Sequence, residues 1–297
     1  MNDQHPSLHR ERLKYITAVV LYGTIGMFLR FVALPSEVVA MARGILGSAF
    51  IFLYLRVRGD RPDRAAIRRN LRLLLLSGFA LGLNWIFLFA AYETTTVAVA
   101  SLCNYMAPLI VILAAPLALK EKLNKKKLPC VAVALLGIVL VSGVADGGLG
   151  NPAGVALGLT AAGCFVCIVL CNRKLRGIRA MDRALVQLAV SAATILPYAL
   201  VHNRGIHIQA DLLSLLVVLM LGLLHTGVAY CLYFSGMASL PVQTVAVLGY
   251  LEPVVSVLCS AVFLHEAMGI SGWIGAVLIL GAAVVSETLP PEKNGGK

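Results

Sequence analysis

Long hydrophobic stretches alternate with short polar stretches along the whole chain. A helix of roughly 20 apolar residues crosses the hydrocarbon core of a membrane and satisfies its own backbone hydrogen bonds. The pattern predicts ten such helices, at 15–34, 36–55, 71–92, 96–118, 128–145, 152–172, 184–201, 212–237, 241–264 and 269–287. We therefore expect an all-α polytopic membrane protein with short loops and no soluble domain.

The composition supports this fold class. Of the 297 residues, 59% are apolar and 13% are charged, with a mean hydropathy of +0.87. Soluble domains carry about 25% charged residues, so this chain is far poorer in charge than a soluble protein. Membrane lipid is consequently an expected partner over most of the surface.

The basic residues lie on one side of the predicted topology. The N-terminal tail, the loops at 56–72, 120–127 and 173–183, and the C-terminal tail hold 22 Lys and Arg residues. The opposite side holds only Arg30 and Arg204. This is the positive-inside distribution, and it predicts a cell (inner) membrane protein with both termini cytoplasmic. The net charge of +11 is thus a topology signal, and we expect no nucleic-acid partner.

Cysteine placement does not favour a metal site. All seven cysteines fall inside predicted spans, and Cys164, Cys167 and Cys171 share one face of the sixth helix. No His or acid lies nearby in that segment to complete a coordination shell, so we interpret these thiols as small packing residues. No metal and no cofactor is expected.

An internal repeat relates the two halves of the chain. With a shift of 145 residues, Thr96–Glu121 aligns with Pro241–Glu266. The matching pairs include Tyr105 with Tyr250, Pro108 with Pro253, Glu121 with Glu266, Phe89 with Phe234, and Trp85 with Tyr230. Since five spans separate the copies, they run in opposite directions across the membrane. Inverted repeats are typical of alternating-access transporters, which bind solute near the midplane between the halves.

The segments 84–121 and 221–266 resemble the two EamA repeats of the drug/metabolite transporter superfamily. The resemblance extends over nearly the whole chain. It implies a cytoplasmic tail at 1–14, a first repeat at 15–145, a second at 152–287 and a cytoplasmic tail at 288–297. It also implies a central cavity lined by spans 1, 3, 4, 6, 8 and 9. The substrates it implies are amino acids, metabolites, organic cations or nucleotide-linked sugars, usually exported.

Ionisable residues inside the spans are candidate functional residues, because burying them in a membrane is costly. His225 and Glu252 lie about midway through neighbouring helices. Together they could relay a proton or hold a cation, so protons are a possible coupling ion. Alternatively, a backbone carbonyl satisfies His225 and helix-end amides satisfy Glu252.

Four aromatic residues, Trp85, Tyr105, Tyr230 and Tyr250, occupy the middle tier of the membrane and suit an apolar or cationic solute. Ordinary core packing is the alternative. Asn84 and Asn104 either orient the solute or bridge helices. Pro108 and Pro253 each delete a helical hydrogen bond and predict kinks that free carbonyls near Asn104 and Gly249.

The remaining candidates are structural or gating residues. Arg43 could snorkel outward, pair with a carboxylate or hold a substrate carboxylate, and we favour a structural role. Glu121 and Glu266 end spans four and nine, where gating roles and solvated helix ends are both plausible. Two small-residue pairs, Gly78 with Gly82 and Gly154 with Gly158, predict close helix contacts.

The sequence contains no catalytic motif of the common hydrolase kinds. GxSxG and Walker A sequences are absent, and His265-Glu266 is not followed by the second His of HExxH. We therefore expect a secondary active transporter of an amino acid or similar amphipathic metabolite, operating as an exporter. An importer of a small organic cation or metabolite is the alternative, ahead of a channel or an intramembrane enzyme.

Overall fold

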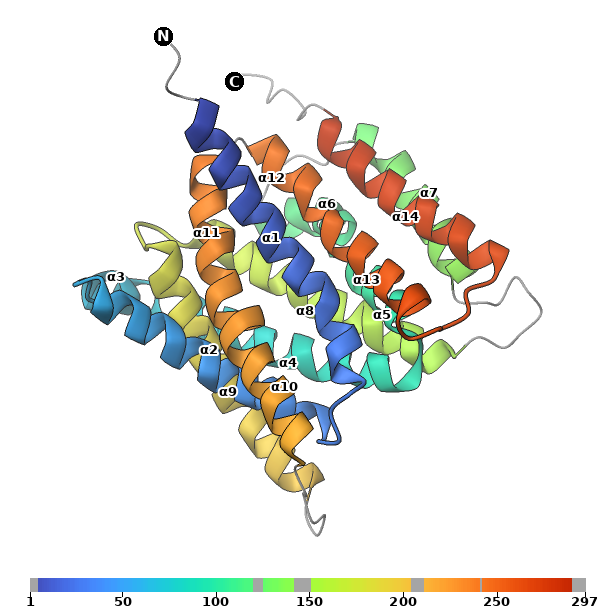
Figure 1. The fold of residues 1–297 in the computed structure, drawn as a ribbon. Coiled ribbons are helices and arrows are strands. Elements are labelled where there is room, and N and C mark those ends of the chain that lie inside the picture. The colour runs from blue at the N-terminus through green and yellow to red at the C-terminus, as the bar shows by residue number, and fades with distance from the viewer. Residues whose placement is uncertain (1–4, 120–124, 142–150, 204–210, 241, 290–297) are drawn as a thin grey trace, which may run out of the picture.

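The computed structural model describes residues 5–119, 125–141, 151–203, 211–240 and 242–289, and these residues are almost entirely helical. Figure 1 shows the helices packed into one bundle. They are α1 (His5–Leu29), α2 (Ser36–Val57), α3 (Arg64–Arg69), α4 (Leu71–Thr94), α5 (Val97–Asn104), α6 (Ala107–Leu119), α7 (Leu128–Val141), α8 (Pro152–Lys174), α9 (Ala180–His202), α10 (Leu212–Gly222), α11 (Ala229–Ser239), α12 (Val242–Gly249), α13 (Leu251–Val262) and α14 (Ile270–Thr288).

Each predicted span corresponds to a helical segment. Seven segments of the described chain are long and apolar enough to cross a membrane, and three shorter apolar helices are Leu128–Val141, Leu251–Val262 and Ile270–Ser286. The all-α polytopic fold predicted from the sequence is confirmed. In span order the segments are α1, α2, α4, α5–α6, α7, α8, α9, α10–α11, α12–α13 and α14.

The fourth and ninth spans are each broken into two helices. α5 ends at Asn104 and α6 begins at Ala107, while α12 ends at Gly249 and α13 begins at Leu251. Pro108 and Pro253 lie in the first turn of the following helix, where the missing N–H costs least. The single kinked helices predicted for 96–118 and 241–264 are therefore helix pairs, interrupted at repeat-equivalent positions.

The eighth span contains a π-helical segment, Leu223–Val228, between α10 and α11. The wider turn places the Thr226 hydroxyl 2.8 Å from the carbonyl oxygen of Leu221, five residues back. Gly227 faces Phe50 of α2 so closely that an added Cβ would lie 2.6 Å from the ring. Such π-bulges are frequent at functional sites.

The contacts between helices follow the repeat. α2 packs on α9, α5 on α13, and α7 on α14, and each of these pairs joins one span to its repeat counterpart. Two further contacts, α4 with α8 and α1 with α11, each join different spans of the two repeats. The repeat relation converts the first of these contacts into the second. In Figure 1, α7 and α14 lie side by side at the edge of the bundle. The contact pattern thus has the pseudo-two-fold symmetry of an inverted repeat.

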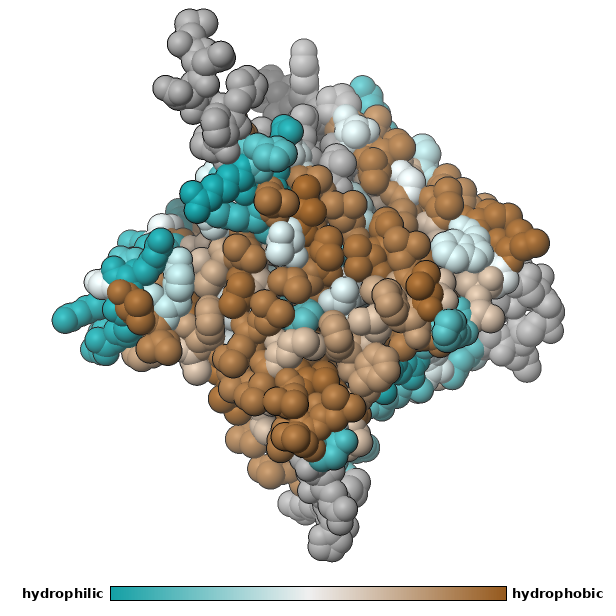
Figure 2. Space-filling model, viewed as in Figure 1, coloured by the Kyte–Doolittle hydropathy of each residue, from teal (hydrophilic) through white to brown (hydrophobic). Residues whose placement is uncertain are grey.

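The surface has the polarity that a bilayer requires. We call the face where α1 begins and α14 ends the terminal face, and the opposite face the far face. Figure 2 shows hydrophobic side chains over α1, α10, α11 and α13, with hydrophilic ones gathered around α3 and the start of α1. Leu53, Leu216 and Val277 are 62%, 55% and 68% exposed and fit a lipid-facing surface.

Glycines hold α8 against its neighbours. A Cβ added at Gly158 would lie 2.7 Å from Cys103 Cβ on α5, and one added at Gly154 would lie 2.6 Å from Thr95 Cβ. Gly78 and Gly82 meet Val190 and Thr194 of α9 in the same way. The predicted small-residue contacts are therefore present between α4 and α9 and between α8 and α5.

We predict that Gly158→Leu destabilises the folded protein by about 1–3 kcal/mol, because the larger side chain overpacks the α5–α8 contact. Gly163 of the same helix has no atom within 4 Å of an added Cβ, so Gly163→Leu is a matched control that should be tolerated. Thermal unfolding and monodisperse yield of both variants in one detergent measure the difference. Equal stability would show that Gly158 does not lie at a close contact.

Candidate functional site

A cavity of about 400 Å³ lies at the centre of the bundle, between helices of both repeats. Its wall combines aromatic, apolar and charged side chains. The lining residues are Tyr22, Ile25, Arg43, Leu81, Asn84, Trp85, Leu88, Phe89, Tyr92, Asn104, Phe165, Ile168, Val169, Asn172, Arg183, Gln187, Tyr230, Tyr233, Phe234, Met237 and Glu252. This volume fits a small metabolite.

Arg43 is a buried cation in the cavity wall. Its guanidinium carbon lies 4.6 Å from the centroid of the Trp85 ring and 5.5 Å from that of Phe89. Its Nε donates a hydrogen bond of 3.2 Å to Thr226 Oγ1, in the π-helical segment. The residue is only 3% exposed, so it does not snorkel, and no carboxylate of the described residues lies within ion-pair distance. The purely structural role that the sequence favoured for Arg43 is therefore not a full description, since Arg43 also lines the cavity.

Glu252 contributes a carboxylate to the same cavity from the first turn of α13. The Tyr105 hydroxyl is close enough to this carboxylate to interact with it electrostatically. Among the described residues no basic side chain forms an ion pair with Glu252, although Arg43 is close enough to interact with it electrostatically. The cavity thus contains two opposite charges that are not joined in a salt bridge.

Both predicted asparagines line the cavity and also join helices. Asn84 Nδ2 donates to Asn104 Oδ1 at 3.1 Å and to the Ala161 carbonyl of α8 at 2.8 Å. Of the predicted aromatic residues, Trp85 and Tyr230 line the cavity. The Tyr230 ring packs against Tyr22 with centroids 5.9 Å apart.

The structure does not place His225 beside Glu252. The His225 ring is 1% exposed, its Nε2 lies 3.0 Å from Thr24 Oγ1, and its Nδ1 lies 3.4 Å from the Met220 carbonyl oxygen. It packs edge-on against Phe28, outside the cavity lining. Local partners satisfy this ring, so the predicted His–carboxylate pair is not formed.

Tyr250 follows the core-packing alternative rather than the cavity-lining one. It packs in a separate hydrophobic cluster with Val257, Ala276 and Ile279. Tyr105 is absent from the lining but interacts electrostatically with Glu252. Both tyrosines lie in the helix interruptions, Tyr105 between α5 and α6 and Tyr250 between α12 and α13.

Arg183 is the principal cavity residue that sequence reasoning missed. It was assigned to the basic loop at 173–183, but α9 begins at Ala180 and carries Arg183 into the cavity wall. Its guanidinium carbon lies 5.3 Å from the Phe234 ring centroid, and its buried Nε has no hydrogen-bond partner among the described residues. The polar residues Arg183, Gln187 and Ser191, four apart along α9, were the available signal.

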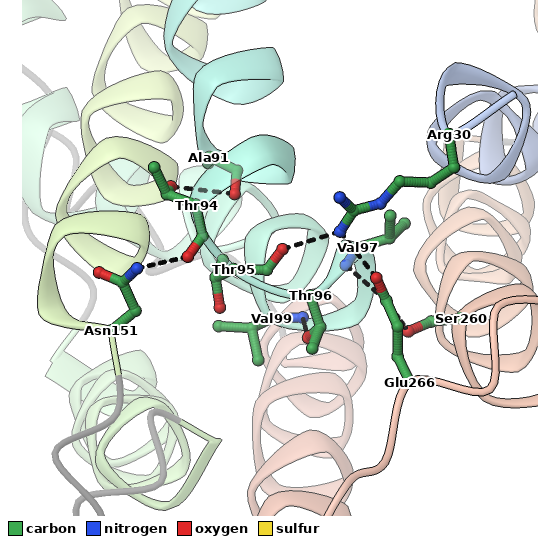
Figure 3. Close-up of polar contacts among 10 residues, drawn as sticks. All are labelled: Arg30, Ala91, Thr94, Thr95, Thr96, Val97, Val99, Asn151, Ser260 and Glu266. Atoms are coloured by element: carbon green, nitrogen blue, oxygen red, sulfur yellow. Dashed lines mark hydrogen bonds and ion pairs between the residues drawn. The ribbon is translucent and has the colours of Figure 1, made fainter. Parts of the chain in front are cut away.

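A polar cluster lies on the far face, beyond the end of the cavity. We call Arg30, Thr95, Val97, Ser260 and Glu266 the far-face cluster (Figure 3). Arg30 Nη2 lies 2.7 Å from Glu266 Oε1 and 3.1 Å from the Thr95 carbonyl oxygen. Glu266 Oε2 accepts hydrogen bonds from Val97 N at 2.9 Å and from Ser260 Oγ at 2.5 Å.

The far-face cluster joins α1, the α4–α5 connection and the end of α13. Glu266, a predicted gating residue, is its central acceptor. Its repeat counterpart Glu121 lies outside the described residues. On the opposite side, the cavity extends to Asn172, Arg183 and Met237. These residues lie within about one turn of the helix ends at the terminal face.

Comparisons with known proteins agree with this architecture. A transporter of Bacillus subtilis (strain 168), named uncharacterized transporter YxxF, is 24% identical over 90% of this chain and 89% of its own length. The protein PecM of Dickeya dadantii (strain 3937) is 28% identical over 73% of this chain and 74% of its own. One crystal structure, 22% identical, superposes with a TM-score of 0.65 over 93% of this chain and 96% of the other, which shows a shared fold.

The family comparison is decisive because it matches both halves. The sequence model of the EamA-like transporter family matches residues 13–143 and again residues 152–288. These two matches cover the helices that build the cavity and the far-face cluster. The chain belongs to the EamA-like transporter family and is a multi-pass membrane transporter.

Proposed function

We propose that this transporter is a secondary carrier that exports an amphipathic metabolite bearing an amine and an acid, such as an amino acid, by alternating access. The observation that supports this most strongly is the pair of unjoined opposite charges, Arg43 and Glu252, in one aromatic-lined cavity. Buried charges without partners are costly, and a zwitterionic solute supplies the missing counter-charges. Arg43 offers a planar fork for the acid, and Glu252 accepts from the amine.

The alternative solute, a small organic cation, fits this wall less well. A cation would gain from Glu252 and from the aromatic rings. It would also be repelled by Arg43 and Arg183, which both line the cavity. A solute that carries an acidic group matches these charges better.

The proposed direction of transport rests on charge asymmetry. The described basic segments, at 10–14, 56–72, 125–127 and 173–179, lie at the terminal face, and the positive-inside rule makes that face cytoplasmic. The cavity reaches towards this face, while the far-face cluster ties the helices together on the other side. The structure then corresponds to a state that takes up solute from the cytoplasm.

Alternating access requires the far-face cluster to open and reform. Its contacts join α1 and α5 of the first repeat to Ser260 and Glu266 of the second. Breaking them would let the second repeat move away from the first at that face. We propose that the Arg30–Glu266 ion pair is the principal contact that must break.

Proton coupling is a further part of the proposal and depends on Glu252. The groups that interact electrostatically with this carboxylate come from five other spans and are Tyr15, Tyr22, Arg43, Tyr92, Tyr105, Tyr230 and Tyr233. Among these groups, Arg43 is the single one that is ordinarily charged near neutral pH. A carboxylate in this setting can exchange a proton for a solute amine.

We predict that Glu252→Gln abolishes the response of transport to a pH gradient while the protein remains folded. Gln keeps the shape of the side chain but cannot ionise. Flux of labelled amino acids into proteoliposomes, with and without an imposed pH gradient, measures the effect. Wild-type pH dependence in the variant would remove Glu252 from the coupling mechanism, and non-saturating flux in the wild type would contradict the carrier itself.

We also predict that Glu266→Gln increases amide hydrogen exchange in the first turn of α5 by about tenfold. The reason is that a charge-assisted hydrogen bond to Val97 N, worth roughly 1.5–3 kcal/mol, becomes a neutral one or is lost. Exchange mass spectrometry on the wild type and the variant measures it. Glu93→Gln, an exposed acid near the end of α4, is the matched control and should change nothing. Unchanged exchange in Glu266→Gln would show that the far-face cluster does not hold these helices together.

A further inference from the structure

Two arginines in the cavity have a common architecture. Arg43 lies on α2 over Phe89, and Arg183 lies on α9 over Phe234. α2 and α9 are the second spans of their repeats, and Phe89 and Phe234 are one repeat shift of 145 residues apart. Arg43 and Arg183 are not themselves repeat counterparts, but each lies on the second span of its repeat beside one of these equivalent phenylalanines.

The inversion places these arginines towards opposite ends of the cavity. Arg43 comes seven residues after α2 begins at the far face, a depth of about 10 Å at 1.5 Å per residue. Arg183 comes three residues after α9 begins at the terminal face, a depth of about 5 Å on the same rise. Trp85, Leu88 and Ile168 contribute apolar surface to the same cavity.

Arg183 has hydrogen-bonding capacity that the described protein does not use. Its Nε is buried without a partner, and no ion pair reaches its guanidinium among the described residues. The neighbouring Gln187 donates to Ser77 Oγ at 2.6 Å and to Asn172 Oδ1 at 2.8 Å. These bonds fix Gln187 and Asn172 in the cavity wall that Arg183 also lines, and no acceptor for the Asn172 amide N–H groups is found among the described residues.

We propose that Arg183, with Asn172, forms a second acid-binding subsite, so that the transported solute carries two acidic groups separated by an apolar or aromatic middle. One acid binds Arg43 and the other binds Arg183. With Glu252 accepting an amine, such a solute supplies a partner for each of the three charged side chains in the cavity. This inference rests on the proposed transport function and narrows its substrate class to elongated diacids.

The test uses α,ω-dicarboxylates from adipate to sebacate as probes of the spacing, each compared with the monocarboxylate of equal chain length. Binding is measured by calorimetry on the full chain in nanodiscs, with empty nanodiscs as the blank. For wild type we expect one chain length to bind at least about tenfold tighter than its monocarboxylate, the gain from one added charged hydrogen-bonding group. Equal affinity for the two series, or no binding of either, overturns the subsite.

Variants test whether Arg183 causes the tighter binding of the dicarboxylate. Arg183→Gln should abolish the preference for the dicarboxylate while changing monocarboxylate affinity by less than about twofold, because one acid still binds Arg43. Arg183→Lys keeps the charge without the planar fork and should retain part of the preference. Arg72→Gln, which removes an exposed charge at the start of α4, should retain all of it. A preference that survives in Arg183→Gln overturns the proposal.

The outcome is distinguishable from failure of the transport function. Saturable flux of an amino acid in proteoliposomes, together with no dicarboxylate preference, contradicts the second subsite alone. Absence of saturable flux contradicts the carrier, whatever the binding data show.

Discussion

In the hydrocarbon of a membrane, a polar group without a protein partner is so costly that it must be paired or face a water-filled space. The helices of this transporter satisfy their own backbone groups over most of their length, and the interruptions occur where the bundle is protected. The breaks after Asn104 and Gly249, and the π-helical turn at Leu223–Val228, lie within the bundle. Thr226 in that turn receives the Nε hydrogen bond of Arg43, so irregular backbone and buried charge support one another.

The same constraint explains why the charges in the cavity are informative. Arg43 is held by a hydroxyl and two aromatic rings, contacts that position a guanidinium but leave its charge without a described counter-ion. Glu252 likewise has no described basic partner at ion-pair distance, although Tyr105 interacts with it electrostatically. In a purely structural site, the two would be expected to pair. Their separation leaves space for a solute that completes both.

The sequence predicted much of the fold because its signals are global. Hydropathy locates the spans because each must be long enough to cross the bilayer. The 145-residue repeat and the basic loops then give the direction in which each span crosses the membrane. Five of the substrate-binding or coupling candidates line the cavity, namely Asn84, Trp85, Asn104, Tyr230 and Glu252, and polar or aromatic residues at the midplane have few other uses. These choices required only the depth of each residue within the membrane.

The errors concern rotation about the helix axis and local helix ends. His225 has the right depth, but the π-helical turn directs its ring to Thr24 and Met220. Tyr105 and Tyr250 occupy helix breaks whose effect on side-chain direction could not be read from depth. Arg183 was counted with a loop because a boundary error of four residues moved it outside the helix that carries it. Each error follows from a local backbone feature that hydropathy does not encode.

The central claim, that one cavity is exposed alternately to the two faces, is tested most directly by paired distances. Spin labels at Glu93 and Ala267 would report on the far face, and labels at Arg72 and Ser235 on the terminal face, in a protein without its native cysteines. Alternating access predicts that Arg30→Ala, which breaks the far-face ion pair, lengthens the first distance and shortens the second. Distances that stay unchanged, or that lengthen together at both faces, would contradict the account.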